Sequence, residues 1–196
     1  MKIRWYFSGL ITLFGIFPML MYSQPGPAIK KQLPAIVLSP AEKEIIHQVN
    51  EYRKEQGLNP VRVSLSLTYV AQCHVHDLAG NHPDSRQCNL HSWSNDGSWS
   101  PCCYTGDHKE APCMWNKPRE LTNYDSEGYE IAYWTDEPLS AHDFALKALK
   151  GWKRSTEHNN VILNRSMWKE KEWKAVGAGY YEGYAVVWFG EIPDNE

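Results

Sequence analysis

Histidines and cysteines are the side chains of this sequence that could do chemistry, and it contains eight of the former and five of the latter. Neutral imidazoles beside a carboxylate can hold Zn²⁺ or a similar ion and leave positions open to water or to a ligand. A histidine oriented by a carboxylate can instead act as a general base. No Gly-x-Ser-x-Gly, His-Glu-x-x-His or phosphate-binding glycine motif is present in the sequence. Ion binding and general-base chemistry are therefore the two hypotheses to carry forward.

Several histidines have a structural interpretation from their local sequence. His74 and His76 lie two apart on one predicted helix, so they cannot face one ion from the same side. Together with Cys73 they are expected to serve packing and surface roles. His82 and His108 lie in polar loop segments, and we expect them to be solvated.

The segment from residue 81 to 126 shows neither helical nor strand periodicity. An unpatterned stretch of this length inside a compact domain needs a reason, either crosslinking or a functional role. Trp93, Trp99 and Trp115 lie in it and could line a cleft that stacks on sugars or grips an apolar ligand. Holding the irregular loop against a sheet is the favoured interpretation of these rings.

All five cysteines are disulfide candidates if the protein is exported. Cys88, Cys102, Cys103 and Cys113 lie in the irregular segment, and Cys73 precedes it. In an oxidising compartment we expect two crosslinks among the four with Cys73 left over, or else Cys73 paired and one of the four free. A zinc knot is disfavoured because the sequence has no Cys-x-x-Cys pair.

Composition limits the class of partner. The chain has 196 residues, of which 42% are hydrophobic and 22% charged, and its formal net charge is -3. This length suits one domain with a sizeable core. The acidic balance excludes a surface built for nucleic acid and offers no polybasic membrane patch.

The N-terminal segment predicts export. Lys2 and Arg4 precede an apolar run that ends near Ser23, which is the pattern of a signal peptide over residues 1–23. An uncleaved anchor is the alternative, but Gly9, Gly15 and Pro18 weaken the run as a spanning helix. Residues 24–38 are interpreted as an exposed lead-in. We therefore expect a secreted or periplasmic protein with no stable membrane span after signal removal.

The remaining sequence predicts helices flanking a small antiparallel sheet, an α+β architecture. The expected elements are a helix over about 40–56, a helix from Ser64 or Ser66 to Gly80, a helix from Ser140, a short helical turn after Ser155, and strands over 128–134, 176–181 and 184–192. Glu182-Gly183 joins the last two strands as a hairpin turn.

Six segments together resemble a known family. They are Val49-Asn-Glu-Tyr-Arg53 with Gly57-Leu58, the His91 region, Gly128-Tyr-Glu-Ile-Ala132, Trp152-Lys-Arg-Ser155 with His158 and Ile162-Leu163, Val176-Gly-Ala-Gly179, and Trp188-Phe-Gly190. In this order they resemble the CAP superfamily of cysteine-rich secretory, antigen 5 and pathogenesis-related proteins, in its bacterial SCP-like extracellular form. The resemblance covers about residues 40–191. It implies a domain over residues 39–196, folded as a three-layer α-β-α sandwich with a cysteine-rich insertion at about 85–126.

The resemblance also implies a cleft in which two histidines and an acidic residue converge. His91 and His158 take the histidine positions and are the expected ligands of a divalent cation, zinc or another. The family's glutamate position holds Tyr129 in an ungapped match, so Glu130 and Glu127 are the acidic candidates, and Tyr129 and Ser155 are cleft neighbours.

Two functions are consistent with such a cleft. The first is an interaction role in which the cleft binds a divalent metal ion or a small apolar ligand, with an extracellular or envelope partner. The alternative is a metal-dependent or general-base hydrolase acting on peptide or cell-envelope substrates.

Overall fold

The computed structural model describes Met1 and residues 31–194. Apart from Met1, the predicted signal peptide and the first part of the lead-in lie outside the described residues. From residue 31 to 38 the lead-in has neither helix nor strand. Lys31 attaches it to the domain, because its backbone N–H donates to the Asn123 side chain at 2.7 Å and its ammonium donates to the Arg119 carbonyl at 2.7 Å. Within residues 31–194 no helix is both long and apolar enough to cross a membrane.

The domain consists of six α-helices, one 3₁₀ turn and three strands within the described residues. In chain order they are α1 (Pro40–Glu55), α2 (Leu65–Asn81), α3 (Ala111–Trp115), α4 (Lys117–Leu121), β1 (Gly128–Trp134), α5 (Ala141–Arg154), α6 (Thr156–Ile162), η1 (Ser166–Trp168), β2 (Ala175–Tyr181) and β3 (Tyr184–Gly190). The strands form an antiparallel sheet in the order β1-β3-β2, so β3 is central and β1 is an edge strand.

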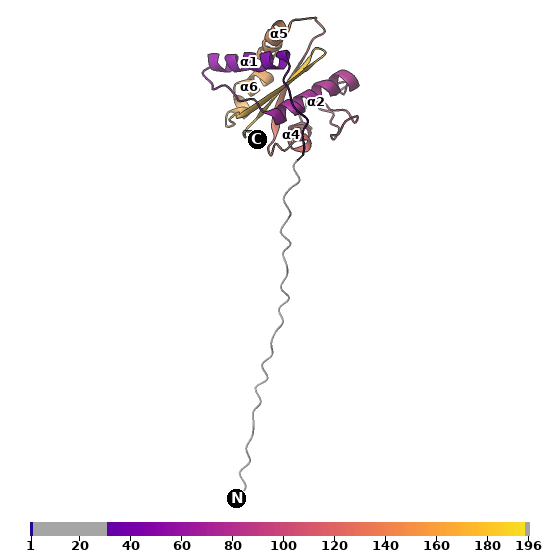
Figure 1. Ribbon diagram of the computed structural model, residues 1–196, viewed down its shortest axis with the longest axis vertical. Coiled ribbons are helices and arrows are strands. Elements are labelled where there is room, and N and C mark those ends of the chain that lie inside the picture. Colours follow the sequence, from indigo (N-terminus) through magenta and orange to yellow (C-terminus); the bar gives the residue numbers. More distant parts are fainter. Residues whose placement is uncertain (2–30, 195–196) are drawn as a thin grey trace.

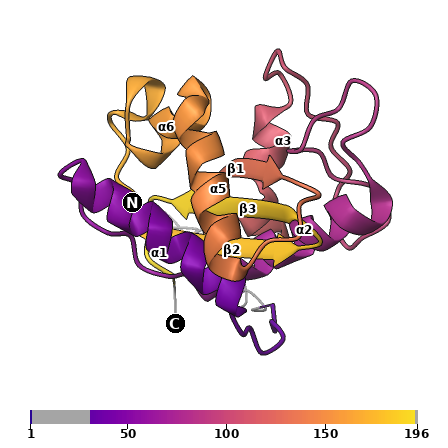
Figure 2. The same cartoon turned by 90° about the horizontal axis from the view of Figure 1, so that it is seen from above.

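Helices cover both faces of this sheet, which confirms the predicted α+β sandwich. Helices α1 and α5 pack together on one face, and α2 packs on the other, so that α1 and α2 lie on opposite sides of the hairpin (Figure 1, Figure 2). Ile45 and Phe144 contribute to the core under α1 and α5, whereas Leu67 and Trp188 contribute to the core under α2. The two cores lie on opposite faces of the sheet, and Trp115 of α3 packs against both of them. The two faces of β1 therefore contact different sets of residues.

The first helix follows the sequence signal closely. Ser39 caps it by accepting a hydrogen bond from the Glu42 N–H at 3.2 Å, and the Glu42 carboxylate accepts one from the Ser39 N–H at 2.6 Å. This reciprocal pair satisfies free amides at the helix start. Pro40 occupies the first turn, where its missing N–H costs nothing.

Two glycines in β2 set the height of α2 above the sheet. A Cβ atom on Gly177 or Gly179 would overlap the backbone of α2 at Leu67 and Ala71. Because neither residue has a side chain, the helix backbone rests directly on the strand. Helix α2 is thereby held close to the sheet along the turn that precedes His74.

The irregular segment contains two short helices that its lack of periodicity did not indicate. Helices α3 and α4 have five residues each, too few for an apolar repeat to be visible, and each has a proline in its first turn. The remainder of this segment is loop, with one isolated bridge between Trp93 and Cys102. The segment extends outward from the sheet beside α2 (Figure 2).

Candidate functional site

The candidate site is a cleft along the free side of edge strand β1. A cavity of about 880 Å³ is lined there by β1, by the irregular segment with α3, and by α6 with η1. Helices α3 and α6 stand on the two sides of β1 (Figure 2). Three segments distant in sequence therefore meet at one strand edge.

Glu130 is the acidic residue at the centre of this site. It pairs in register with Trp188 of β3, so its side chain points to the α2 face of the sheet, whereas Tyr129 points to the other face. The Glu130 side chain is fully buried. Its Oε2 lies 2.5 Å from Nδ1 of His74, and its Oε1 lies 2.8 Å from Nδ1 of His91. Each carboxylate oxygen thus has its own imidazole partner.

The two imidazoles keep Glu130 ionised. Burial would raise the pKa of its carboxyl, but the charge of His74 and the hydrogen bonds from both histidines outweigh burial and hold the pKa below its usual range. A buried carboxylate is stable only when it is paired and hydrogen-bonded in this way.

His91 comes from the irregular segment and has its Nδ1 engaged by Glu130. Its backbone N–H donates to the Asn89 side chain at 3.0 Å, and its ring centre lies 5.2 Å from that of Tyr104. Since Nδ1 is occupied, Nε2 is the ring nitrogen left for other partners.

His158 approaches from the opposite wall. Ser155 caps α6, and its hydroxyl accepts a hydrogen bond from the His158 N–H at 3.3 Å. The ring centres of His91 and His158 are 5.9 Å apart and nearly perpendicular, at 72°. Burial, and secondly the proximity of His91, lower the pKa of His158 to about 4, so this imidazole is neutral at pH 7.

The cleft has a polar end and an apolar end. Near the histidines, the Tyr104 hydroxyl and Nδ1 of His108 are 2.9 Å apart. Burial and the nearby Glu130 raise the pKa of Tyr104, which keeps its hydroxyl protonated. The apolar end is formed by aromatic and thioether side chains, namely Met114, Trp115, Tyr129, Met167 and Trp168.

A second, shallower cavity of about 640 Å³ adjoins the first. The two share Leu90, Ala132, Ser155 and His158. His158 therefore stands at the junction between the main cleft and an open groove along the far end of β1.

The structure brings three of the predicted site residues together and places the others around them. His91, His158 and Glu130 converge. Glu127 does not reach the imidazoles, because it lies 3.9 Å from Arg119 and accepts a hydrogen bond from the Tyr129 hydroxyl at 2.9 Å. Tyr129 and Ser155 both line the cleft, as neighbours rather than as partners of the histidines.

His74 is buried and His108 is exposed, as the sequence interpretation expected, but the contacts that the two histidines make at the site were not indicated. His74 is fully buried, and both of its ring nitrogens are engaged, Nε2 lying 2.9 Å from the Ser92 carbonyl oxygen. His108 lines the cleft and contacts Tyr104, although its loop is polar in sequence. A signal existed for His74, since it falls on the buried face of α2, but nothing in the local sequence indicates a carboxylate opposite it.

The three tryptophans of the irregular segment divide between the two interpretations. Trp93 stacks on His74, with ring centres 4.2 Å apart and an angle of 7° between the ring planes. Trp99 in turn packs edge-on against Trp93. These two rings hold the segment against α2, the favoured interpretation. Trp115 instead forms part of the cleft wall.

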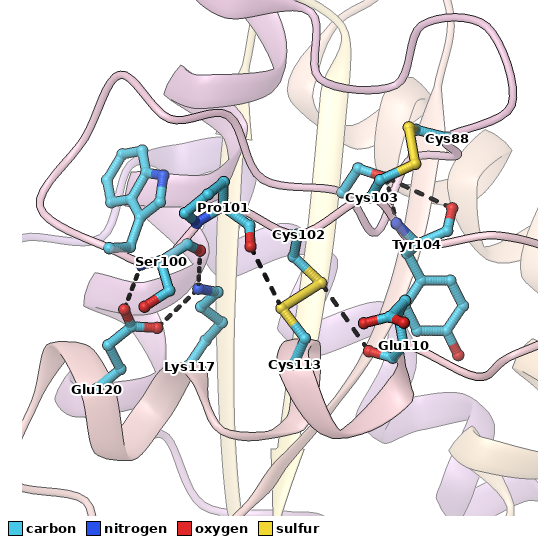
Figure 3. The surroundings of a disulfide bond; sticks show 12 residues. Cys88, Ser100, Pro101, Cys102, Cys103, Tyr104, Glu110, Cys113, Lys117 and Glu120 are labelled. Carbon is cyan, nitrogen blue, oxygen red and sulfur yellow. Dashed lines mark hydrogen bonds and ion pairs between the residues drawn. A yellow bond between two sulfur atoms is a disulfide. The ribbon is translucent and has the colours of Figure 1, made fainter.

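Two disulfides crosslink the segment that carries His91 (Figure 3). They join Cys88 to Cys103 and Cys102 to Cys113, which confirms the expected pair of crosslinks among the four loop cysteines. Cys73 is the free cysteine and is half-buried. The first bond links the chain just before His91 to the residue preceding Tyr104, so the cleft wall that these two rings form is covalently closed.

A divalent cation would find two ligands in the cleft. Zn–N bonds of about 2 Å are compatible with imidazole centres as close as those of His91 and His158. Within the described residues, however, no group of three or more His, Cys, Asp and Glu side chains is arranged to hold a metal ion. Any such ion would need its remaining ligands from water or from a bound molecule.

Comparison with known proteins places these residues in context. The model of the cysteine-rich secretory protein family matches residues 46–186, a range that includes Glu130, His91 and His158. An outer surface protein of Borrelia burgdorferi is 16% identical with a TM-score of 0.51, over 80% of this chain and 96% of that one. An extracellular protein of Bacillus anthracis that contains a SCP domain is 17% identical with a TM-score of 0.52, over 81% of this chain and 45% of that one. This chain thus spans less than half of the Bacillus protein. No curated protein matches the chain.

Proposed function

Since this chain belongs to the cysteine-rich secretory protein family, we propose that it is an extracellular binding module whose cleft takes a small ligand together with a divalent cation. The observation that carries the proposal is the pair His91 and His158, 5.9 Å apart on the wall of a cavity of about 880 Å³. A cavity of this size, apolar at one end and with a few polar groups at the other, is typical of small-molecule sites.

The cation is proposed to bind at Nε2 of His91 and at the His158 imidazole. Histidines that bind metals usually have their second nitrogen engaged by a carboxylate or carbonyl, which fixes the ring. Glu130 provides that contact to Nδ1 of His91 at 2.8 Å. His158 is neutral at pH 7, as a metal ligand must be. When bound, Zn²⁺ would supply a positive centre with open positions for a donor atom of the ligand.

The ligand is proposed to place an apolar body against Trp115 and Trp168. These rings come from α3 and η1 and pack edge-on against each other with centres 6.2 Å apart, so they form one continuous apolar wall of the cleft. Aromatic walls gain free energy chiefly by excluding water from an apolar surface. The amphiphilic character of the cleft therefore favours a molecule with one apolar and one polar end.

Calorimetric titration with zinc chloride tests the cation site. We expect one saturating site in the wild type and its loss in His91→Ala and in His158→Ala. His47→Ala is the matched control, because His47 is an exposed histidine of α1 that lies 4.0 Å from Glu51 and does not line the cleft. Equal heats in all four proteins would refute the cation site.

An environment-sensitive anilinonaphthalene dye tests the apolar end. Its fluorescence should rise on binding the wild type, and Trp115→Leu should weaken that binding. Trp134→Leu is the control, since Trp134 is a half-exposed tryptophan that does not line this cavity. If both variants bind the dye like the wild type, the apolar end is not a binding surface.

One observation favours hydrolysis as a second candidate function. His91 is oriented by Glu130 in the way that a carboxylate orients a general base. Water would have to be the nucleophile, because the Ser155 hydroxyl is used to cap α6 and contacts Glu157 at 3.2 Å. A labelled protein substrate such as fluorescent casein tests this candidate. Hydrolysis that is lost in His91→Ala and kept in His47→Ala would support it, and no hydrolysis by the wild type would exclude it for peptide substrates of this kind.

Export is also proposed, with residues 1–23 as the signal that is removed. The basic start and the apolar run support it, as does the pair of disulfides, which form in oxidising compartments. Intact mass measurement of protein recovered outside the cytoplasm should show the loss of an N-terminal segment ending near Ser23. Recovery of the full-length mass would contradict removal of the signal.

A further inference from the structure

We infer that His74 is a positioning residue of the cleft: through Glu130 it fixes which nitrogen of His91 is presented to a bound partner. The inference rests on the proposed function only in taking the bound partner of His91 to be a divalent cation. His74 does not line the cleft. Its contacts nevertheless determine how the carboxylate between it and His91 is held.

The hydrogen bonds of His74 leave it a single orientation. A carbonyl oxygen only accepts, so the Nε2 that lies 2.9 Å from the Ser92 oxygen carries a hydrogen and donates it. Turning the ring over would bring carbon atoms against both Glu130 and the Ser92 carbonyl. In a site that is fully buried, the loss of both hydrogen bonds would leave polar groups without partners, which is unfavourable.

Stacking holds the same ring from its face. Trp93 lies parallel to His74 at 4.2 Å, and the Lys117 ammonium lies 5.3 Å from the Trp93 ring. The Trp93 backbone exchanges hydrogen bonds of 2.8 and 2.9 Å with Cys102. His74 is therefore fixed by a stack that is itself tied to the disulfide-crosslinked segment.

A fixed His74 gives Glu130 a fixed orientation as well. One carboxylate oxygen is held by His74 at 2.5 Å, which directs the other oxygen to Nδ1 of His91 at 2.8 Å. An ionised carboxylate only accepts hydrogen bonds, so His91 must carry its hydrogen on Nδ1. In the neutral imidazole, Nε2 then keeps a lone pair, the form in which imidazole binds a metal ion or accepts a proton.

The alternative is that His74 only fills space in the core beneath α2. A residue with that role would affect stability without affecting the tautomer of His91. The tautomer is therefore the readout that separates the two roles.

The experiment is long-range ¹H–¹⁵N spectroscopy of the metal-free protein labelled at histidine. The wild type should show His91 with a protonated Nδ1 and an unprotonated Nε2, its signals assigned by their absence in His91→Ala. His74→Phe keeps the ring that stacks on Trp93 but removes both hydrogen bonds, and His91 should then show averaged shifts from two tautomers. His74→Gln can still donate to Glu130 and should restore the wild-type shifts.

His76→Phe is the matched control, since His76 is an exposed residue of the same helix. Unchanged His91 shifts in a folded His74→Phe protein would overturn the inference, as would averaged shifts in His74→Gln. If His74→Phe does not fold, the wild-type spectrum still tests the inference, because a His91 tautomer protonated on Nε2 would contradict the proposed arrangement.

Zinc titration of the same variants separates this inference from the proposed function. Loss of a carboxylate or carbonyl partner behind a metal ligand typically costs about 10- to 100-fold in affinity. We expect a loss of that size in His74→Phe and none in His76→Phe. If the wild type binds no zinc, the cation proposal fails while the tautomer result stands by itself.

Discussion

Gly179 of β2 packs directly against the carbonyl group of Ala71 in α2, three residues before His74. No side chain can enter this contact without moving the helix. Because His74 must meet a carboxylate on an adjacent part of the sheet, the height of α2 above the sheet is part of the geometry of the site.

Replacing Gly179 by alanine should therefore destabilise the protein. The added Cβ would overlap the Ala71 backbone, and overpacking of this kind costs about 1–3 kcal/mol in the free energy of unfolding. Guanidinium unfolding followed by tryptophan fluorescence measures it. Gly80→Ala is the control, since Gly80 lies in α2 with no atom within 4 Å of the added Cβ, and alanine is the better helix former. Equal stability of the two variants would contradict the close contact.

The disulfide between Cys88 and Cys103 should matter for both stability and the cleft. It closes a loop of sequence separation 15, for which chain entropy predicts about 3 kcal/mol. Replacing both cysteines by alanine should lower the free energy of unfolding by about this amount and weaken zinc binding, because His91 and Tyr104 lie next to the bond in sequence.

Cys73→Ala is the control for the crosslinks, since Cys73 is not bonded to another cysteine. Peptide mass mapping after alkylation of the untreated wild type should find Cys73 as the alkylated residue, with Cys88 joined to Cys103 and Cys102 joined to Cys113. Five alkylated thiols in exported material would sink the disulfide assignment.

The lowered pKa of His158 predicts a loss of stability in mild acid. The unfolded chain binds a proton at His158 near pH 6.5, whereas the folded protein does so only near pH 4. The unfolded state therefore holds more protons between these values, and stability falls as the pH drops through this window. The shift corresponds to at most about 3 kcal/mol, and because the ring is half-buried we expect about 1–2 kcal/mol.

Comparison with His158→Gln measures this contribution. The glutamine variant should lose less stability than the wild type between pH 6.5 and pH 4, and His47→Gln, which alters an exposed histidine, should follow the wild type. Parallel pH curves for the wild type and His158→Gln would show that His158 is not buried as described.

The sequence indicated the elements of this fold better than the partners within its site. Ser39-Pro40-Ala41-Glu42 contains the whole capping signal of α1, because a cap is a contact between neighbours in the chain. The contact of Glu130 with His74 spans 56 positions, and no local pattern records it. The pairing of the four loop cysteines was unreadable for the same reason, since it depends on how the segment folds.

The two acidic candidates show where family resemblance also stops. Glu127 and Glu130 lie three residues apart, and an ungapped match to the family placed Tyr129 at the glutamate position. The register of β1 on β3 distinguishes the two carboxylates. Glu130 faces α2, whereas Glu127 precedes the strand and contacts Arg119. A single step along β1 reverses the side to which a residue points, so the resemblance could narrow the choice but not make it.

This difference yields a matched pair of substitutions. Glu130→Gln keeps the size of the side chain but removes the charge that holds Nδ1 of His91, so zinc affinity should fall by about 10- to 100-fold. Glu127→Gln makes the same chemical change outside the histidine pair and should leave zinc affinity at the wild-type value. Calorimetric titration at pH 7 measures both, after circular dichroism has verified that each variant is folded. Equal losses in the two variants would point to a general effect of negative charge near the cleft, and a loss in Glu127→Gln alone would reverse the assignment of the acidic residue.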